Sequence, residues 1–264
     1  MAGFFSFTEV TDPAAHPAYN EWHQLDHMPE QMPLEGIVHG ERWVISPGCR
    51  RRLLRVDDDF AHAHYLTLYL MTGPVETALH SFYERAEELH RENRFFPHRR
   101  AIAAGPLRLR RTWVSPRLSV TAAALPHRPN RGAYVAVHSP TRASDSPVHV
   151  LEERVGDLLS VTGVAGVSSF EPFRHVPSSL DRAGDRAADR AADRVGEDAH
   201  RPTGANRRFE ADVLVCYLDE DPAAVSNDIG SILASVYQLA GITPNFAGPL
   251  EAIVPWKWDW FEQG

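Results

Sequence analysis

Apolar and polar positions along the chain follow two different periods, and these predict where strands and helices lie. Residues 3–10 alternate aromatic and polar side chains, which is the period of a strand with one buried face. Residues 64–71 form a nearly continuous apolar run and predict a buried strand. Residues 75–93 carry apolar side chains at helical spacing, namely Leu79, Phe82, Ala86 and Leu89. The pattern therefore predicts a protein that mixes strands with amphipathic helices.

A helix with two histidines is predicted between the first two strands. Asp12 and Pro13 have the residue types of an N-cap and a first helical position. His23 and His27 are four residues apart and therefore share one face of this helix. Pro29 has no amide hydrogen, and its ring clashes with the carbonyl four residues back. We therefore expect the helix to end at about residue 27 or 28.

The predicted elements repeat along the chain. Strands over residues 36–45 and 101–114 complete the order βαββαβ, which is that of a ferredoxin-like half-barrel. The tetrapeptide Ala-Gly-Pro-Leu at residues 104–107 recurs unchanged at residues 247–250, each time with a tryptophan close behind it. We therefore predict a duplication. Its parts are a first half at residues 1–115, a linker at 116–131 and a second half at 132–264.

The second half contains a low-complexity insertion at about residues 177–207. It includes the segment DRAGDRAADRAADR, which has no apolar residue larger than alanine and so has nothing with which to build a core. We favour disorder for this insertion. A solvated helix supported by its alternating charges is the alternative.

The histidine helix and the strand after it resemble the motif of the EthD-like branch of the dimeric α+β barrel superfamily. The matching residues are an aromatic residue, a His-Met-Pro-Glu run, a glycine and an Arg-Trp pair, here Trp22, His27-Met28-Pro29-Glu30, Gly36 and Arg42-Trp43. The proline that usually precedes the glycine directly is displaced to Pro33.

The fold class that this resemblance implies is α+β. Two separate chains of that superfamily cover their bare sheet faces by pairing sheet to sheet. Here we expect two tandem ferredoxin-like halves to do so within one chain, as a pseudo-dimer. The two sheets should then enclose a barrel-like cavity that takes a small ligand.

Composition narrows the possible partners. The chain of 264 residues has a net charge of −8, which argues against a general nucleic-acid binder. No apolar run approaches the roughly 20 residues that span a bilayer, and the first residues lack the basic start of a signal peptide. Cys49 and Cys216 provide neither a disulfide framework nor a structural zinc set. We expect a cytoplasmic protein without nucleic-acid or membrane partners, and a monomer or loose homodimer because the barrel is complete in one chain.

His27 and His23 are the candidate catalytic residues. At a helix end the negative end of the helix dipole favours a protonated imidazole, so His27 is expected to act as a proton donor near neutral pH. A structural hydrogen bond to a loop carbonyl is the alternative role for His27, and His23 could face solvent instead. Two histidines four apart can also bind a metal when a third ligand arrives. The sequence leaves that ligand open among His39, His62, His64, Glu30 and Glu41.

The candidate substrate-binding residues come mainly from the strand at residues 64–71. Alternation places Tyr65, Thr67 and Tyr69 on one face and leucines on the other. We expect the leucines to pack on helices and the hydroxyl groups to line the cavity and orient a ligand, with Phe5 and Phe7 adding an apolar wall. The alternative is that the two tyrosines only pack where the sheets meet.

Arg42 is the remaining substrate-binding candidate. It either binds an acidic group of the ligand or pairs with Glu41 or Glu30, and we favour the ion pair.

The resemblance implies a cofactor-independent enzyme that acts on a small apolar or aromatic, polyketide-like molecule. Fold alone does not select the reaction. We favour acid–base chemistry of a lyase, isomerase or cyclase, and the alternative is a non-catalytic binding or accessory protein. A metal or haem enzyme with histidine ligands is the least favoured reading. The helix of the second half carries only His149, so we predict one functional site per chain, in the first half.

Overall fold

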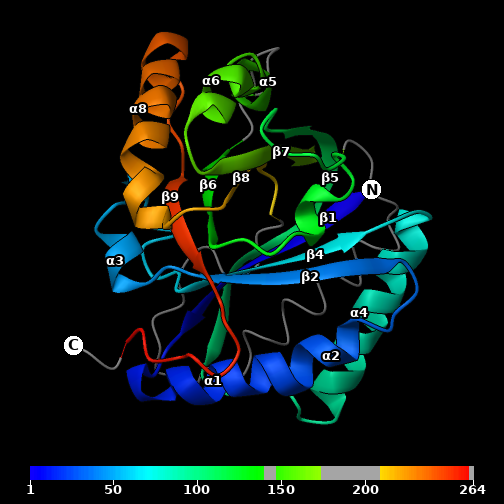
Figure 1. Ribbon diagram of the computed structural model, residues 1–264. Helices are drawn as coiled ribbons and strands as arrows, with labels where there is room; N and C mark the ends of the chain where they lie inside the picture. The colour runs from blue at the N-terminus through cyan, green and yellow to red at the C-terminus, as the bar shows by residue number, and fades with distance from the viewer. Residues whose placement is uncertain (140–146, 174–208, 262–264) are drawn as a thin grey trace.

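The computed structural model describes residues 1–139, 147–173 and 209–261 (Figure 1). The first part of the chain contains β1 (Ala2–Val10), η1 (Pro13–Ala15), α1 (His16–Trp22), η2 (His23–His27), α2 (Met28–Gln31), β2 (Ile37–Val44), α3 (Pro47–Arg50), β3 (Arg55–Val56), β4 (Tyr65–Met71), α4 (Val75–Arg91) and β5 (Arg99–Val114). The second part contains η3 (Leu125–His127), β6 (Gly132–His138), α5 (Pro147–Glu152), α6 (Val155–Ser160), β7 (Val164–Pro172), β8 (Asp212–Leu218), α8 (Pro222–Ala240) and β9 (Phe246–Ala252). The insertion expected at residues 177–207 lies outside the described residues.

Within the described residues, eight antiparallel strands close into a barrel. Their order is β2-β4-β1-β5-β7-β8-β6-β9, and β9 pairs back with β2. The closing contacts are Trp43 opposite Ala252 and Val44 opposite Glu251. Closure removes the open edges that an isolated sheet presents to solvent. The protein is therefore of the α+β class with an antiparallel barrel, as expected. The origin of its two parts by duplication stays a prediction.

Strand β5 connects the two parts of the barrel. Its first portion pairs with β1, from Arg99 to Arg108, and its last portion pairs with β7, from Leu107 to Val114. One long strand therefore belongs to both parts of the barrel. Strand β9 has a similar double role, since its start pairs with β3 and its end pairs with β2.

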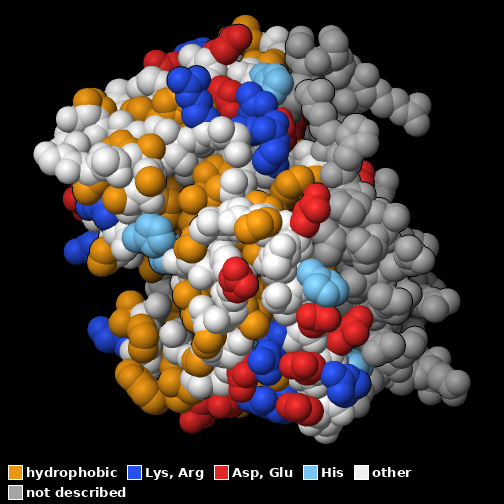
Figure 2. Space-filling model, turned by 90° about the vertical axis from the view of Figure 1, so that its right-hand side faces the viewer, with side chains coloured by type: hydrophobic (Ala, Val, Ile, Leu, Met, Phe, Trp, Pro, Cys, Tyr) orange, Lys and Arg blue, Asp and Glu red, His pale blue; other side chains and the backbone are white. Residues whose placement is uncertain are grey.

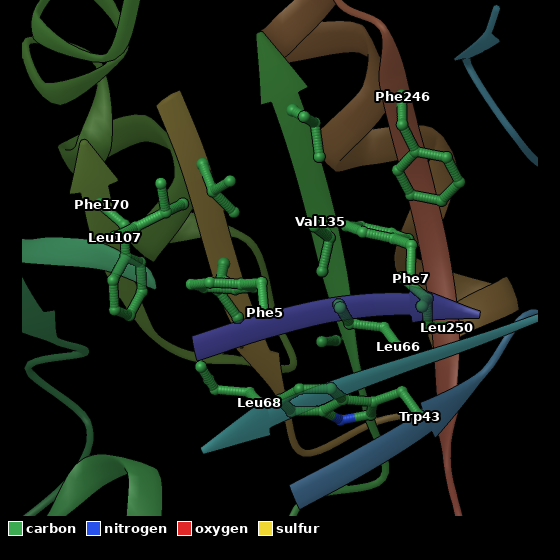
Figure 3. Close-up of a cluster of buried hydrophobic side chains, with 14 of the residues drawn as sticks. Phe5, Phe7, Trp43, Leu66, Leu68, Leu107, Val135, Phe170, Phe246 and Leu250 are labelled. Carbon is green, nitrogen blue, oxygen red and sulfur yellow. The ribbon is translucent and has the colours of Figure 1, made fainter. Parts of the chain in front are cut away.

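Large apolar side chains fill the barrel interior (Figure 3). They come from strands on all sides and include Phe5, Phe7, Trp43, Leu66, Leu68, Phe170, Tyr217 and Phe246. Phe7 alone contacts the rings of three other phenylalanines. A barrel of eight strands is just wide enough for side chains to fill it, and each buried side chain of this size contributes about 1.5–3 kcal/mol. The centre of the barrel, where we expected a ligand cavity, is therefore the main hydrophobic core.

The helices cover the outside of the barrel. Helices α1, α2 and α4 lie along one side of it, and α5, α6 and α8 lie along the other (Figure 1). Helix α4 buries Ala78, Leu79 and Phe82 against residues of β1 and β4. Among the described residues, no helix is both long enough and apolar enough to cross a bilayer.

The end of the chain returns to the first part of the molecule. After β9, Ile253 donates its backbone N–H to the carbonyl of Arg42. Trp260 and Phe261 then pack against a cluster that contains Tyr19 and Tyr65. The last described residues therefore cover the start of helix α1.

Candidate functional site

Polar side chains gather between the helix pair α1–α2 and the outer face of the barrel. The residues of β4 that face this helix are Tyr65, Thr67 and Tyr69, because Leu66 and Leu68 point into the barrel core. Our expectation for the two faces of this strand was therefore wrong, and the hydroxyl groups lie on the helix side.

Phe5 and Phe7 are separated from these hydroxyl groups by the sheet itself. Both lie opposite leucines of β4 and belong to the barrel core, whereas Ser6 lies opposite Thr67 on the other face. Phe5 and Phe7 consequently form no wall of a site that contains Tyr65 and Tyr69, and that prediction was wrong as well.

The helix that carries the histidines does not end at His27. Its first segment, α1, continues through one π-helical turn at His23–His27 into α2, which ends at Gln31. In the π turn the N–H of Met28 donates to the carbonyl of His23, five residues back. This wider turn is compatible with Pro29, which lacks an N–H and would clash with the carbonyl of residue 25 in a regular α-helix. Turns of this kind are frequent at functional sites.

His23 and His27 lie close together under this turn. Their ring centroids are 5.1 Å apart, and the His27 ring stacks on Trp22 at 4.7 Å. His23 is buried, and its Nε2 shares a hydrogen bond of 3.4 Å with the hydroxyl of Thr67. The structure thus brings together three of the residues expected at the site.

Both imidazoles are held in their neutral form. Burial, and after it the positive charges of Arg99, Arg42 and Arg94, lowers the pKa of His27 to about 3. Burial also lowers the pKa of His23 well below its usual range, with Arg42 as the next cause. His27 lies within a continuous helix, so the helix-end argument for a protonated imidazole does not apply. The free protein therefore presents proton acceptors rather than the protonated donor that we expected.

Arg42 lies beside the histidines on β2 and makes no ion pair among the described residues. Its Nη2 donates to Oδ1 of Asn20 at 3.0 Å, while Nε and Nη1 have no hydrogen-bond partner in the described part of the chain. The guanidinium lies over the rings of Tyr19 and Tyr65, 5.4 and 5.8 Å from their centroids. Burial lowers the pKa of Arg42, although the neighbouring tyrosine hydroxyls partly offset this effect.

The two glutamates expected to pair with Arg42 bind other residues. Glu30 pairs with Arg94 and Arg85 on the outside of the helix. Glu41 contacts His39 and accepts a hydrogen bond from Asn130. The favoured ion-pair role of Arg42 was therefore wrong, and its charge has no carboxylate partner in the described part of the protein.

A chain of hydrogen bonds holds Arg42 in place. Asn20 accepts from Arg42 and donates through Nδ2 to the hydroxyl of Tyr65 at 2.9 Å. Tyr65 in turn shares a hydrogen bond of 2.7 Å with Nδ1 of His16. Phe261 stacks on the other side of His16, with ring centroids 3.9 Å apart. The position of the guanidinium thus depends on residues that reach from β2 to the end of the chain.

Several buried polar atoms around Arg42 have no hydrogen-bond partner within the described residues. Besides Nε and Nη1 of Arg42, they are Nδ1 of His23, the hydroxyls of Tyr19 and Tyr69 and both side-chain amide atoms of Gln31. The side chains concerned are exposed by only 4% for His23, 3% for Arg42, 2% for Tyr69 and 1% for Gln31. Folded proteins leave few such groups unpaired, because each costs about 1–3 kcal/mol. Unpaired polar atoms also occur elsewhere, for example at Tyr134 and Tyr217, but on this helix and two adjacent strands they gather around a buried cation.

The third ligands proposed for a metal take part in other contacts. His39 contacts His127 and Glu41, and Nδ1 of His64 accepts from the backbone N–H of Val10 at 3.2 Å. In the described ranges, no three His, Cys, Asp or Glu side chains are placed to hold a metal ion. The residues of the site therefore do not match the metal alternative.

Sequence reasoning missed part of the site. Asn20 and Gln31 lie on the histidine helix, His16 lies one turn earlier, and Arg99 is the second cation near both histidines. A signal for the helix residues was available, since the polar residues 16, 20, 23, 27 and 31 recur every three or four positions and lie on one face. Arg99 offered no comparable signal.

Comparison with known proteins identifies the fold. No family model matches the chain, and no curated protein matches it. A solved structure from Fusobacterium nucleatum subsp. nucleatum, described as a "putative monooxygenase", aligns with a TM-score of 0.52 and 8% identity, over 96% of this chain and 93% of that one. An "anthrone oxidase-like protein" aligns with a TM-score of 0.45 and 9% identity, over 96% and 91% of the two chains.

A third solved structure is a "putative monooxygenase" from Lactobacillus acidophilus NCFM, with a TM-score of 0.43 and 10% identity, over 96% of this chain and 99% of that one. At such identities the likeness concerns the fold alone. Together with the closed antiparallel barrel, the first of these structures supports the dimeric α+β barrel type of fold. The EthD-like branch remains a resemblance of sequence.

Proposed function

We propose that the polar cluster under the π turn is the active site of a cofactor-independent enzyme that moves a proton on a small aromatic or apolar molecule. One observation carries this proposal. Two neutral imidazoles, His23 and His27, lie 5.1 Å apart and next to a buried cation, Arg42. A neutral imidazole accepts a proton, and a nearby cation stabilises the negative charge that the substrate then carries.

The chemistry balances without a further reactant. A C–H or O–H bond of the substrate breaks, its electron pair stays on the substrate, and the proton moves to an imidazole nitrogen. The new negative charge raises the pKa of the imidazole, because an opposite charge favours its protonated form. Return of the proton to another atom completes an isomerisation, and loss of a leaving group completes an elimination.

The proposal has a direct test. Aryl ketones with acidic C–H groups are incubated with the protein in D2O, and loss of the C–H signal is followed by NMR. We expect exchange in the unaltered protein and a loss of roughly a hundredfold or more in His23→Ala or His27→Ala, which is a typical contribution of a general base. Binding of the ketones without any exchange would instead support the non-catalytic binding protein.

A second candidate reaction shares the first step. The structure from F. nucleatum is described as a "putative monooxygenase", and a substrate carbanion can pass its electrons to dioxygen. The balance is then CH2 + O2 → C=O + H2O, with one oxygen atom kept in the product. Oxygen uptake that depends on both substrate and His27 distinguishes this reaction from proton transfer alone.

We also propose that the molecule is a duplicated pair of ferredoxin-like halves with its one site in the first half. The main elements follow the order β, α, β, β, α, β in each part. Where the first part has a continuous helix with a histidine pair, the second part has two short helices, α5 and α6, and only His149. The isolated first half should therefore expose the barrel core and fail to fold as a soluble monomer.

A further inference from the structure

Arg42 differs from the paired arginines because it is buried without a carboxylate partner among the described residues. Four other arginines bind carboxylates, namely Arg94, Arg100, Arg110 and Arg128. On the surface around α4, acidic and basic side chains lie side by side and form ion pairs (Figure 2). Arg42 is far more buried than any of these, yet none of the ion pairs in the described residues includes it. Because burial of an uncompensated ion destabilises the fold, we expect the charge of Arg42 to have a function in ligand binding.

A second cation adds to the positive charge at this place. Arg99 lies over the ring of Phe95 at 5.7 Å, and its Nη2 is 3.5 Å from the hydroxyl of Ser6. Its charge and that of Arg42 both act on His23 and His27. A protein with a net charge of −8 therefore concentrates two positive charges on a buried, otherwise neutral cluster.

Several of the unpaired atoms in this cluster are hydrogen-bond donors. Nε and Nη1 of Arg42 are donors only, and the hydroxyl of Tyr69 is protonated because burial raises its pKa. The one acceptor already used by Arg42 is Oδ1 of Asn20, and Asn20 is itself fixed by Tyr65. Unused donors around a buried cation match a ligand oxygen that carries negative charge.

We propose that Arg42 forms an oxyanion subsite, which takes the carboxylate or ionised hydroxyl of an aromatic acid. The aromatic part follows from the surroundings, where Tyr19, Trp22 and Phe96 pack together around the helix. Bound in this way, the ligand supplies the negative charge that no carboxylate of the described residues supplies to Arg42. The proposal rests on the proposed function only for the location of the site, and it concerns equilibrium binding rather than turnover.

The test uses p-nitrophenol, whose ionised form is yellow. Its visible absorbance is titrated against pH with and without an excess of protein. We expect binding to the protein to shift the colour change to lower pH, because a cation favours the phenolate. In Arg42→Met the shift should disappear, and the affinity for p-nitrophenolate should fall roughly ten- to a hundredfold, the usual range for hydrogen bonds to a charged group.

Matched controls separate charge from shape. The methyl ether 4-nitroanisole does not ionise, so its affinity should change little between the unaltered protein and Arg42→Met. Arg111 also lies over an aromatic ring, that of Trp113 at 5.2 Å, but on β5. Arg111→Met should therefore leave p-nitrophenolate binding unchanged. Circular dichroism melts confirm that each variant is folded.

Benzoate and benzamide identify the source of the oxyanion. Displacement of p-nitrophenolate by benzoate but not by benzamide shows that a carboxylate also fits, whereas displacement by neither restricts the subsite to ionised hydroxyls. Unchanged p-nitrophenolate affinity in Arg42→Met, equal affinity for 4-nitroanisole and p-nitrophenolate, or no binding of any probe overturns the proposal. If the unaltered protein binds p-nitrophenolate through Arg42 but exchanges no ketone proton, the proposed reaction is refuted and the subsite stands.

Discussion

Replacing Arg42 by methionine should make the free protein more stable, although it removes a binding residue. Desolvation of a buried ion costs several kcal/mol, roughly, in the free energy of folding. Among the described residues, Arg42 is buried and has no carboxylate partner that would offset this cost. Two terms oppose the gain. The variant leaves Oδ1 of Asn20 unpaired, at about 1–3 kcal/mol, and loses buried cation–π contacts with Tyr19 and Tyr65, worth about 0.5–2 kcal/mol each.

These terms nearly cancel, and since replacing buried ions by apolar side chains is often neutral or stabilising, we expect Arg42→Met to gain up to about 2 kcal/mol in the free energy of unfolding. For a chain of this size, a gain of about 2 kcal/mol corresponds to a rise in Tm of roughly 4–8 °C. Urea denaturation followed by tryptophan fluorescence measures the first quantity, and circular dichroism melts measure the second. Arg111→Met serves as the control and should stay within about 0.5 kcal/mol of the unaltered protein. A loss of more than about 1 kcal/mol in Arg42→Met refutes the reasoning, because it shows that the guanidinium stabilises the fold.

Three further predictions concern the neighbours of Arg42. His27→Ala should abolish proton exchange in the NMR assay while the fold persists, and His149→Ala should leave exchange unchanged; equal losses would contradict a single site per chain. The pKa of His27 is about 3 when folded and about 6.5 when unfolded, so the unfolded chain binds more protons between these values and stability should fall as pH is lowered through this window. Urea midpoints measured from pH 7 to pH 4 check this. In His27→Gln the urea midpoint should depend less steeply on pH, whereas an unchanged dependence would assign the effect to other groups. Tyr65→Phe removes the hydroxyl shared by His16 and Asn20 and should cost about 1–3 kcal/mol in urea unfolding, while a cost near zero would show that this hydrogen-bond chain is dispensable.

The sequence pattern predicted the positions of strands and helices better than it predicted which face of a strand points into the barrel core. Every residue of β4 is buried, because one face packs in the barrel and the other under a helix. Alternation then separates Tyr65 from Leu66 without indicating which of them faces the barrel. In β1 the same alternation separates Phe5 and Phe7 from Ser6, and only the structure shows that the phenylalanines fill the barrel core.

Two other differences have local causes. Pro29 ends a regular helix, but a single π turn allowed the chain to continue to Gln31. That continuation changed the environment of His27 and with it the sign of its pKa shift. Arg42 and Glu41 are adjacent on one strand, so their side chains point to opposite faces, and an ion pair between them was excluded by geometry that the sequence already contained.

The repeat of Ala-Gly-Pro-Leu was the strongest long-range signal in the sequence. It occurs in β5, which pairs with β1 and β7, and again in β9, which pairs with β2, β3 and β6. The histidines of the sequence selected the helix that we propose as the catalytic one. The partners of those histidines could not be predicted in this way, because Arg99 reaches the site only through the tertiary fold.

A crystal structure of the protein with p-nitrophenolate tests the central claim most directly, since it locates the site. The account predicts the ligand between the π turn and the outer face of β2 and β4, with its phenolate oxygen roughly 2.7–3.1 Å from a guanidinium nitrogen of Arg42. Its ring should lie beside His23 and His27. A ligand found within the barrel core beside Phe7, or against α5 beside His149, would contradict the account.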